Sequence, residues 1–150
     1  MAVFSALDDP IDREILAHLE RHGRISWREL GERVGLGPTA TSDRVRALEQ
    51  RGAITGYAAR VDLGALGISL EAVVEALLHP DTDPDAFEAE LAGTPEVRSA
   101  VHVTGHFDYL IVLACADVAS LDHILRGWKS DGGVLESSTR IILNDLDLSE

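Results

Sequence analysis

The spacing of apolar residues changes once along the chain, and this change constrains the fold more than any other feature of the 150-residue sequence. Up to about residue 60 the apolar residues recur every three or four positions, as on one face of a helix. In residues 68–78 and 97–103 they alternate, as in half-buried strands, and residues 107–115 are apolar on both faces. We therefore expect two domains, at 1–60 and 68–150, joined by a linker at 61–67.

Helix starts and stops are marked clearly in the first domain. Asp9 followed by Pro10 is typical of a helix start, and we expect this helix to stop at residues 22–23, a His-Gly pair. Ser26 with Glu29 three residues later is a capping-box pattern, in which each side chain binds the other residue's backbone N–H. A second helix is therefore predicted to begin at Ser26.

The second and third helices are separated by a short Gly-Leu-Gly turn at residues 35–37. The third helix is expected from Pro38 to about Arg51, and residues 54–61 indicate a short extended segment. Helices joined by such a tight turn predict a helix-turn-helix arrangement. The residues expected in its core are Ile11, Ile15, Leu16, Leu19, Trp27, Leu30, Val34, Thr41, Val45 and Leu48.

The net charge of −13 conceals an uneven distribution. Residues 1–60 hold nine arginines and nine acidic residues, whereas residues 61–150 hold four basic and 17 acidic residues. Because salt screens charges over roughly 8 Å, an acidic second domain does not prevent DNA binding by the first. Arginines bind phosphate or guanine, and short hydroxyl side chains approach base edges, so the third helix is a candidate DNA reader.

The second domain has the order β-α-β-β-α-β, which predicts a ferredoxin-like sandwich and gives the chain an α+β fold class. Asp83 and Asp117 are expected to cap its helices, and the last strand is expected at 138–146. Since strand 107–115 is apolar on both faces, the sheet face without helices is expected to pair in a homodimer or larger assembly. The second helix is expected to face inward through Val118, Leu121, Leu125 and Trp128.

Composition limits the other classes of function. Cys115 is the single cysteine and no CxxC pair is present, so we expect neither a disulfide framework nor a metal centre. No run of about 18 apolar residues indicates a membrane span. The first ten residues lack the pattern of a secretory signal, and we expect a cytoplasmic protein.

Three motifs in order resemble the Lrp/AsnC family of transcriptional regulators, the leucine-responsive or feast/famine proteins. They are Asp-x-x-Asp-x-x-Ile-Leu at 9–16, Arg-Val-x-x-Leu-Glu at 44–49 and Thr-Gly-x-x-Asp at 104–108. The resemblance spans nearly the whole chain. It implies a DNA-binding helix-turn-helix or winged-helix-like domain and a ferredoxin-like domain that senses a small effector. It further implies dimers through the sheets, often assembled into octamers, and no cofactor beyond an amino-acid effector bound between C-terminal domains.

Candidate site residues follow from the third helix and from the resemblance. Those expected to contact double-stranded DNA are Arg28, Pro38, Thr39, Thr41, Ser42, Asp43, Arg44 and Arg46. Those expected to contact the effector are His102, Thr104, Gly105, His106, Asp108 and Thr139, the last by resemblance only. Gly105 allows the backbone to approach a ligand. Asp108 either accepts a hydrogen bond from the α-ammonium of an amino acid or caps its own turn.

Departures from the family pattern keep two other functions open. Gly37 stands where the family usually has a capping serine, Thr41 replaces an aliphatic core residue, and Asp43 places a negative charge on the reading helix. A protein-interaction module with a degenerate helix-turn-helix is one alternative. The other is an enzyme like the tetrapyrrole decarboxylases, for which His102 and His106 are the available residues.

Overall fold

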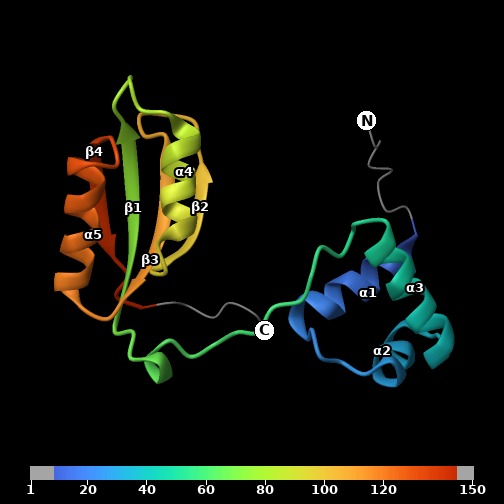
Figure 1. The fold of residues 1–150 in the computed structure, drawn as a ribbon. Coiled ribbons are helices and arrows are strands. Elements are labelled where there is room, and N and C mark those ends of the chain that lie inside the picture. The colour runs from blue at the N-terminus through green and yellow to red at the C-terminus, as the bar shows by residue number, and fades with distance from the viewer. Residues whose placement is uncertain (1–8, 145–150) are drawn as a thin grey trace. The chain divides into compact units, whose positions relative to one another are not determined.

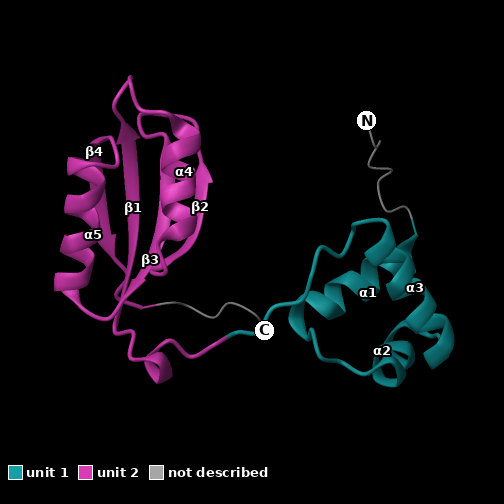
Figure 2. Ribbon diagram, viewed as in Figure 1, with its two compact units in different colours: residues 1–60, 149–150 teal, residues 61–148 magenta. Residues whose placement is uncertain are grey.

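The computed structural model describes residues 9–144, which divide into two compact units with the boundary along the chain between Arg60 and Val61 (Figure 2). The first unit is helical, and the second combines a sheet with helices (Figure 1). The chain is therefore an α+β protein with an N-terminal helix-turn-helix and a C-terminal ferredoxin-like sandwich, as the sequence predicts. Each unit is described by itself below.

Three helices make up the described part of the first unit: α1 (Pro10–Arg21), α2 (Trp27–Val34) and α3 (Pro38–Gln50). The Asp9 carboxylate caps α1 by accepting a hydrogen bond of 2.8 Å from the Ile11 N–H. The Ser26 hydroxyl caps α2 by accepting a hydrogen bond of 3.1 Å from the Glu29 N–H. The predicted starts of these helices are thus confirmed.

The turn between α2 and α3 depends on two glycines. Gly35 ends α2 with φ +72°, a left-handed conformation that costs glycine little. Gly31 lies within α2 and faces the turn and α3. A Cβ at this position would lie 2.5 Å from the Leu36 carbonyl oxygen and 2.8 Å from Thr41 Oγ1. The close approach of α3 to α2 therefore requires a residue without a side chain at position 31. The core of the unit consists of Ile15, Leu19, Leu30, Val34, Val45 and Leu48.

Two expectations for the first unit are wrong. Trp27 is 39% exposed, because as the first residue of α2 it lies at the rim of the core. Glu29 does not close the capping box; its carboxylate instead accepts a hydrogen bond of 2.7 Å from Arg33 one turn later. Residues 54–61 belong to no helix or strand, and the extended segment expected there stays a prediction.

The second unit begins with a short 3-10 turn, η1 (Gly64–Leu66), inside the segment expected as a linker. The elements β1 (Leu70–Leu78), α4 (Pro84–Gly93), β2 (Val97–His102), β3 (Tyr109–Cys115), α5 (Val118–Ser130) and β4 (Val134–Ile141) follow. The strands form an antiparallel sheet in the order β2-β3-β1-β4 within the described residues. Both α4 and α5 lie on one face of this sheet (Figure 1).

The core of the second unit lies between the sheet and the two helices. Alternate residues of β1 are buried there, and Phe87 packs edge-on against Tyr109 at 5.3 Å and Trp128 at 5.9 Å between ring centroids. Cys115 is buried in the same core as a free thiol. The buried members of this core are Ala72, Val74, Ala76, Leu78, Phe87, Leu91, Tyr109, Ile111, Leu113, Cys115, Leu121, Trp128 and Val134.

The opposite face of the sheet is partly apolar, as the sequence predicts. Val73 of β1 pairs with Val112 of β3, and Leu110 pairs with Val101 of β2, which is 51% exposed. An ion pair of 2.8 Å between Arg140 and Glu75 crosses the same face. This face combines apolar side chains with one ion pair, and neither α4 nor α5 covers it (Figure 1).

Two details of the second unit differ from expectation. Val118 is 61% exposed, because it is the first residue of α5 and lies ahead of the turn that meets the sheet. The last strand begins at Val134 and ends at Ile141, whereas it was expected at 138–146. Residues 145–146 of that expectation lie outside the described part of the chain. Within residues 9–144 no helix is long and apolar enough to cross a membrane.

Candidate DNA-binding helix and effector site

The exposed face of α3 carries most of the residues expected to contact DNA. Pro38, Thr39, Asp43 and Arg46 are exposed and Ser42 is half-buried, so five of the predicted side chains share one side of the helix. The opposite side packs into the core through Val45 and Leu48. The helix therefore presents hydroxyl, carboxylate and guanidinium groups together on one surface.

Thr41 does not belong to this surface. Its side chain is fully buried, and its hydroxyl donates a hydrogen bond of 2.9 Å to the Gly37 carbonyl. Position 41 faces Gly31 of α2, where the two helices approach each other closely and only a small side chain fits. The expectation that Thr41 contacts DNA is corrected by this burial, whereas the expectation that it lies in the core is confirmed.

Arg44 points toward α1 instead of away from the domain. Its Nη1 donates hydrogen bonds of 2.6 Å to Asp9 Oδ2 and 2.7 Å to Asp12 Oδ1. The hydrogen bond from Arg44 is the main reason that the pKa of Asp9 is lowered. Arg51 Nη1 lies 3.7 Å from Asp12 Oδ2 and extends the cluster. Arg44 thus joins α3 to α1, and the sequence expectation that it reads DNA lacks support from this geometry.

Arg28 and Arg46 each form an ion pair on the surface. Arg28 Nε lies 3.1 Å from Glu32 Oε1, and Arg46 Nη1 lies 3.9 Å from Asp43 Oδ1. All four side chains are at least 66% exposed. Such pairs are worth little in water, so phosphate can displace them at small cost.

The turn between β2 and β3 is attached to the end of β1 by Asp108. The Asp108 carboxylate accepts a hydrogen bond of 2.8 Å from the Leu78 N–H, and the Asp108 N–H donates to the Ala76 carbonyl at 2.9 Å. Gly105 within the turn has φ +126°, a backbone conformation that residues with a side chain rarely adopt. The Asp108 carboxylate therefore anchors the turn to β1 instead of capping its own turn, and the expected contact with an α-ammonium group stays a prediction. Thr104, Gly105 and His106 are exposed around it.

The two histidines expected at the effector site have different surroundings. His106 Nε2 lies 3.2 Å from Glu136 Oε2 of β4, and both side chains are more than half exposed. The His102 ring stacks on the Tyr109 ring with centroids 4.8 Å apart. Thr139 lies farther off, on β4 opposite Val74. The structure therefore gathers the residues of the turn and His102, but not Thr139, at one end of the β2–β3 pair.

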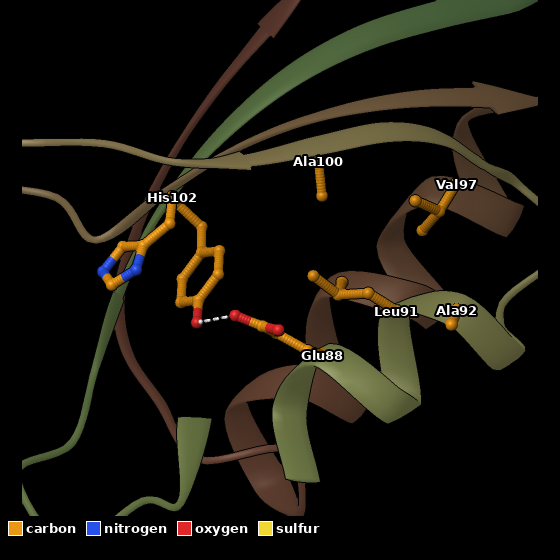
Figure 3. A pocket seen from close by; sticks show the side chains of 7 residues that line it. Glu88, Leu91, Ala92, Val97, Ala100 and His102 are labelled. Carbon is orange, nitrogen blue, oxygen red and sulfur yellow. Dashed lines mark hydrogen bonds between the residues drawn. The ribbon is translucent and has the colours of Figure 1, made fainter. Parts of the chain in front are cut away.

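A cavity of about 350 Å³ opens beside His102, between α4 and the strands β2 and β3 (Figure 3). Glu88 stands at its polar end, where Oε1 accepts a hydrogen bond of 2.9 Å from the Tyr109 hydroxyl. Burial, and then this bond, raise the pKa of Tyr109 to about 12. Neither residue was predicted from sequence, because a glutamate on a helix and a tyrosine in a strand carry no signal of a shared site. The other lining residues are Leu91, Ala92, Val97 and Ala100.

A helix-turn-helix unit joined to a ferredoxin-like unit with a cavity of ligand size defines the class of two-domain DNA-binding regulators that respond to small molecules. Comparison with known families agrees. Residues 8–55 match the model described as winged helix-turn-helix DNA-binding, and residues 71–149 match that of the Lrp/AsnC ligand binding domain. The chain belongs to the Lrp/AsnC family of transcriptional regulators.

Similar proteins cover nearly the whole chain. It is 37% identical over 139 residues to the HTH-type transcriptional regulator LrpA of Mycobacterium tuberculosis, covering 93% of this chain and 91% of that one. It is 40% identical over 145 residues to the leucine-responsive regulatory protein of Escherichia coli K12, covering 94% and 88%. These relatives are named as regulators, and the family is not one of enzymes. The alternative of a decarboxylase-like enzyme is therefore wrong.

Solved structures share the same architecture. A transcriptional regulator from Neisseria meningitidis, solved as its complex with L-methionine, matches with a TM-score of 0.86 and 30% identity over 93% of this chain and 92% of that one. A feast or famine regulatory protein from M. tuberculosis, also complexed with L-methionine, matches with a TM-score of 0.85 and 33% identity over 94% and 95%.

Proposed function

We propose that this chain is a sequence-specific regulator that binds a pseudo-palindromic DNA site as a homo-oligomer and responds to an amino acid. The observation that carries the proposal is that one polar residue of α3 binds α1 while other polar residues of α3 stay exposed. Arg44 holds the helix against α1, which leaves Arg46, Asp43 and Thr39 exposed together on the opposite surface. A helix fixed in place with a polar outer face is what the major groove accepts.

Each exposed residue has a defined task in this proposal. Arg46 binds phosphate or the O6 and N7 atoms of guanine, and Asp43 accepts from the N4 amino group of cytosine. Thr39 and Ser42 approach phosphates or base edges near the start of α3. Arg28 of α2 and Pro38 contact the flanking backbone. Because Asp43 repels phosphate, we expect the preferred site to contain a C·G pair opposite it.

The homo-oligomer is proposed to form through the helix-free face of the sheet. Val73, Leu110 and Val112 offer an apolar centre there, and the Glu75–Arg140 ion pair lies beside it. Burial of such a face drives association, and a two-fold dimer presents two reading helices. Domains at 1–60 and 68–150 with a linker at 61–67 are part of the same proposal, which leaves the choice between dimer and octamer open.

The effector is proposed to be an amino acid, bound near the β2–β3 turn between C-terminal domains. Two relatives of similar fold were solved with L-methionine, which supports this class of ligand. Backbone N–H groups around Gly105 suit a carboxylate. An effector alters DNA binding only if its affinity differs between two assemblies.

The test is selection of DNA fragments from a random library over several rounds, with and without a pool of the 20 amino acids. Enrichment of a pseudo-palindrome, and a change in the enriched set with one amino acid, are the expected results. No enrichment at low salt, where phosphate contacts are strongest, would contradict DNA binding. It would instead favour a protein-interaction module with a degenerate helix-turn-helix.

A further inference from the structure

The cavity beside α4 opens to solvent and has an apolar wall. Ala92 and Leu91 line it from the helix, and Val97 and Ala100 line it from the strand (Figure 3). The Ala100 side chain points from β2 toward the helix that carries Leu91 (Figure 3). Two alanines in these positions leave a space of about 350 Å³, at the small end of the range for ligand pockets. The wall therefore suits an apolar group of the size of a leucine or phenylalanine side chain.

At one end of this cavity, one of the two carboxylate oxygens of Glu88 accepts a hydrogen bond from the protein. Glu88 Oε1 accepts the hydrogen bond from Tyr109, which is 2% exposed and held in place by the core. Among residues 9–144, Glu88 Oε2 accepts no hydrogen bond. Because the phenol fixes the position of the carboxylate, Oε2 is oriented before any ligand arrives. A carboxylate oxygen so placed is an acceptor for a cationic N–H donor.

The charges around the cavity favour a cation over an anion. Asp85 and Asp108 both act on Tyr109 through their negative charge, in addition to Glu88. His102 is the one basic side chain among the described lining residues, and its ring stacks on Tyr109. A carboxylate ligand would meet repulsion from three acidic groups, whereas an ammonium group would be attracted.

We propose that this cavity binds a small primary amine with an apolar substituent, whose ammonium group donates to Glu88 Oε2 while the substituent packs against Leu91 and Ala100. The site goes beyond the proposed function, because the carboxylate of an amino acid would have to point out of the cavity toward solvent. It differs from the turn residues Thr104–Asp108 in that it lies between α4 and the strands β2 and β3 and takes its selectivity from Glu88.

The first test measures binding by calorimetry with three probes that share a phenyl group. Phenethylamine has the amine alone, 3-phenylpropionate has the carboxylate alone, and L-phenylalanine has both. Phenethylamine is expected to bind the full chain and 3-phenylpropionate is not. Glu88→Gln is expected to weaken phenethylamine binding about tenfold or more, because a charge-assisted hydrogen bond is lost. The control Glu90→Gln, which removes a charge from the same helix outside the cavity, is expected to keep at least half the affinity.

The second test fills the cavity. Ala92→Leu adds a larger side chain at a lining position, whereas Ala89→Leu adds the same side chain at a position of the same helix that does not line the cavity. Loss of phenethylamine binding in the first variant alone is expected, with circular dichroism confirming that both fold. Ala100→Leu repeats the test from the strand side. Equal binding to wild type, Glu88→Gln and Ala92→Leu, or no binding of phenethylamine to wild type at millimolar concentration, would overturn the proposal.

The two proposals fail in different ways. If phenethylamine binds through Glu88 but L-phenylalanine does not, the cavity stands and an amino-acid effector at this site is excluded. If phenethylamine binds but no DNA site is enriched, the cavity stands and the regulatory function fails. If DNA is enriched and responds to an amino acid whose effect Ala92→Leu leaves unchanged, the effector binds outside this cavity, as proposed for the β2–β3 turn. The cavity then stands or fails on phenethylamine binding alone.

Discussion

Arg44 of α3 donates a hydrogen bond of 2.7 Å to Asp12 of α1, and this contact fixes the reading helix on its domain. The same Nη1 donates to Asp9, which caps α1. The cap of the first helix and the position of the third are therefore linked through one guanidinium group. Arg44, which the sequence suggests as a DNA contact, thus binds two carboxylates of its own domain.

Arg44→Ala should destabilise the N-terminal unit. The side chain is 34% exposed and Asp12 is 10% exposed, so the loss leaves a mostly buried carboxylate without its main partner. We expect a decrease of about 1–2 kcal/mol in the free energy of unfolding, measured by urea denaturation. Arg46→Ala is the matched control and should change stability by less than about 0.5 kcal/mol, because its partner is a surface pair. An equal effect of both substitutions would contradict the assignment.

The same contact predicts a dependence on acid. Arg44 lowers the pKa of Asp9 below its ordinary value of 3.8, so the carboxylate form stabilises the folded state. This stability is present above pH 3.8 and is lost as the pH falls through the lowered pKa. Arg44→Ala should therefore flatten the fall of stability below pH 3.8. A fall as steep as in wild type would show that other carboxylates account for it.

Gly31→Ala should destabilise the helix-turn-helix although alanine favours helices. The new Cβ would meet the Leu36 carbonyl oxygen at 2.5 Å, and that atom belongs to backbone and cannot rotate away. Overpacking of this kind costs about 1–3 kcal/mol. Gly127→Ala in α5 meets nothing within 4 Å and should stabilise by about 0.5–1 kcal/mol. Thermal unfolding of both variants measures the two changes, and a Gly31→Ala variant as stable as wild type would contradict the predicted clash with the Leu36 carbonyl.

Tyr109 should ionise far above the usual range of tyrosine. Its pKa is raised from 10.0 to about 12 by burial and by the bond to Glu88. The protonated form stabilises the folded state below pH 10, and this contribution is lost as the pH rises from 10 to about 12. The measurement is ultraviolet titration in a Tyr57→Phe background. Glu88→Gln should lower the pKa of Tyr109 without returning it to 10, because burial is the larger cause.

Asp108 is predicted to anchor its turn to β1 by accepting a hydrogen bond. We expect the negative charge of its carboxylate to contribute less than the acceptor oxygen. Asp108→Asn retains an oxygen that accepts from the Leu78 N–H and should stay within about 0.5 kcal/mol of wild type. Asp108→Ala leaves that N–H without its acceptor and should lose about 1–2 kcal/mol. Amide hydrogen exchange at Leu78 reads the contact directly. Fast exchange in the alanine variant alone is expected, and slow exchange in both would contradict the anchoring role.

The elements of the fold could be predicted because local signals and burial agree. Asp9, Ser26, Asp83 and Asp117 each cap the helix expected after them, and the alternation in β1 matches its burial. The errors lie at helix starts and edges. Trp27 and Val118 have the correct spacing for a core face, but as the first residues of their helices they extend past the core.

The site was predicted less well, because its contacts join residues distant in sequence. Arg44 lies 32 residues from Asp12, and Glu88 lies 21 residues from Tyr109. Spacing on a helix gives the side of the helix but not the partner that a long side chain reaches. Thr41 shows the converse, since its place in the core followed from spacing while its polar side chain suggested DNA.

DNA binding by the outer face of α3 is tested by measuring DNA affinity against salt concentration for the selected site. Wild type, Arg46→Ala and Arg44→Lys are compared, the last retaining a positive charge near Asp12. We expect Arg46→Ala to weaken binding by about 1–3 kcal/mol, or to reduce the salt slope by about one, with the stability of the protein unchanged. Arg44→Lys should keep the salt slope of wild type. An unchanged affinity and slope in Arg46→Ala would contradict the claim that the outer face of α3 binds DNA.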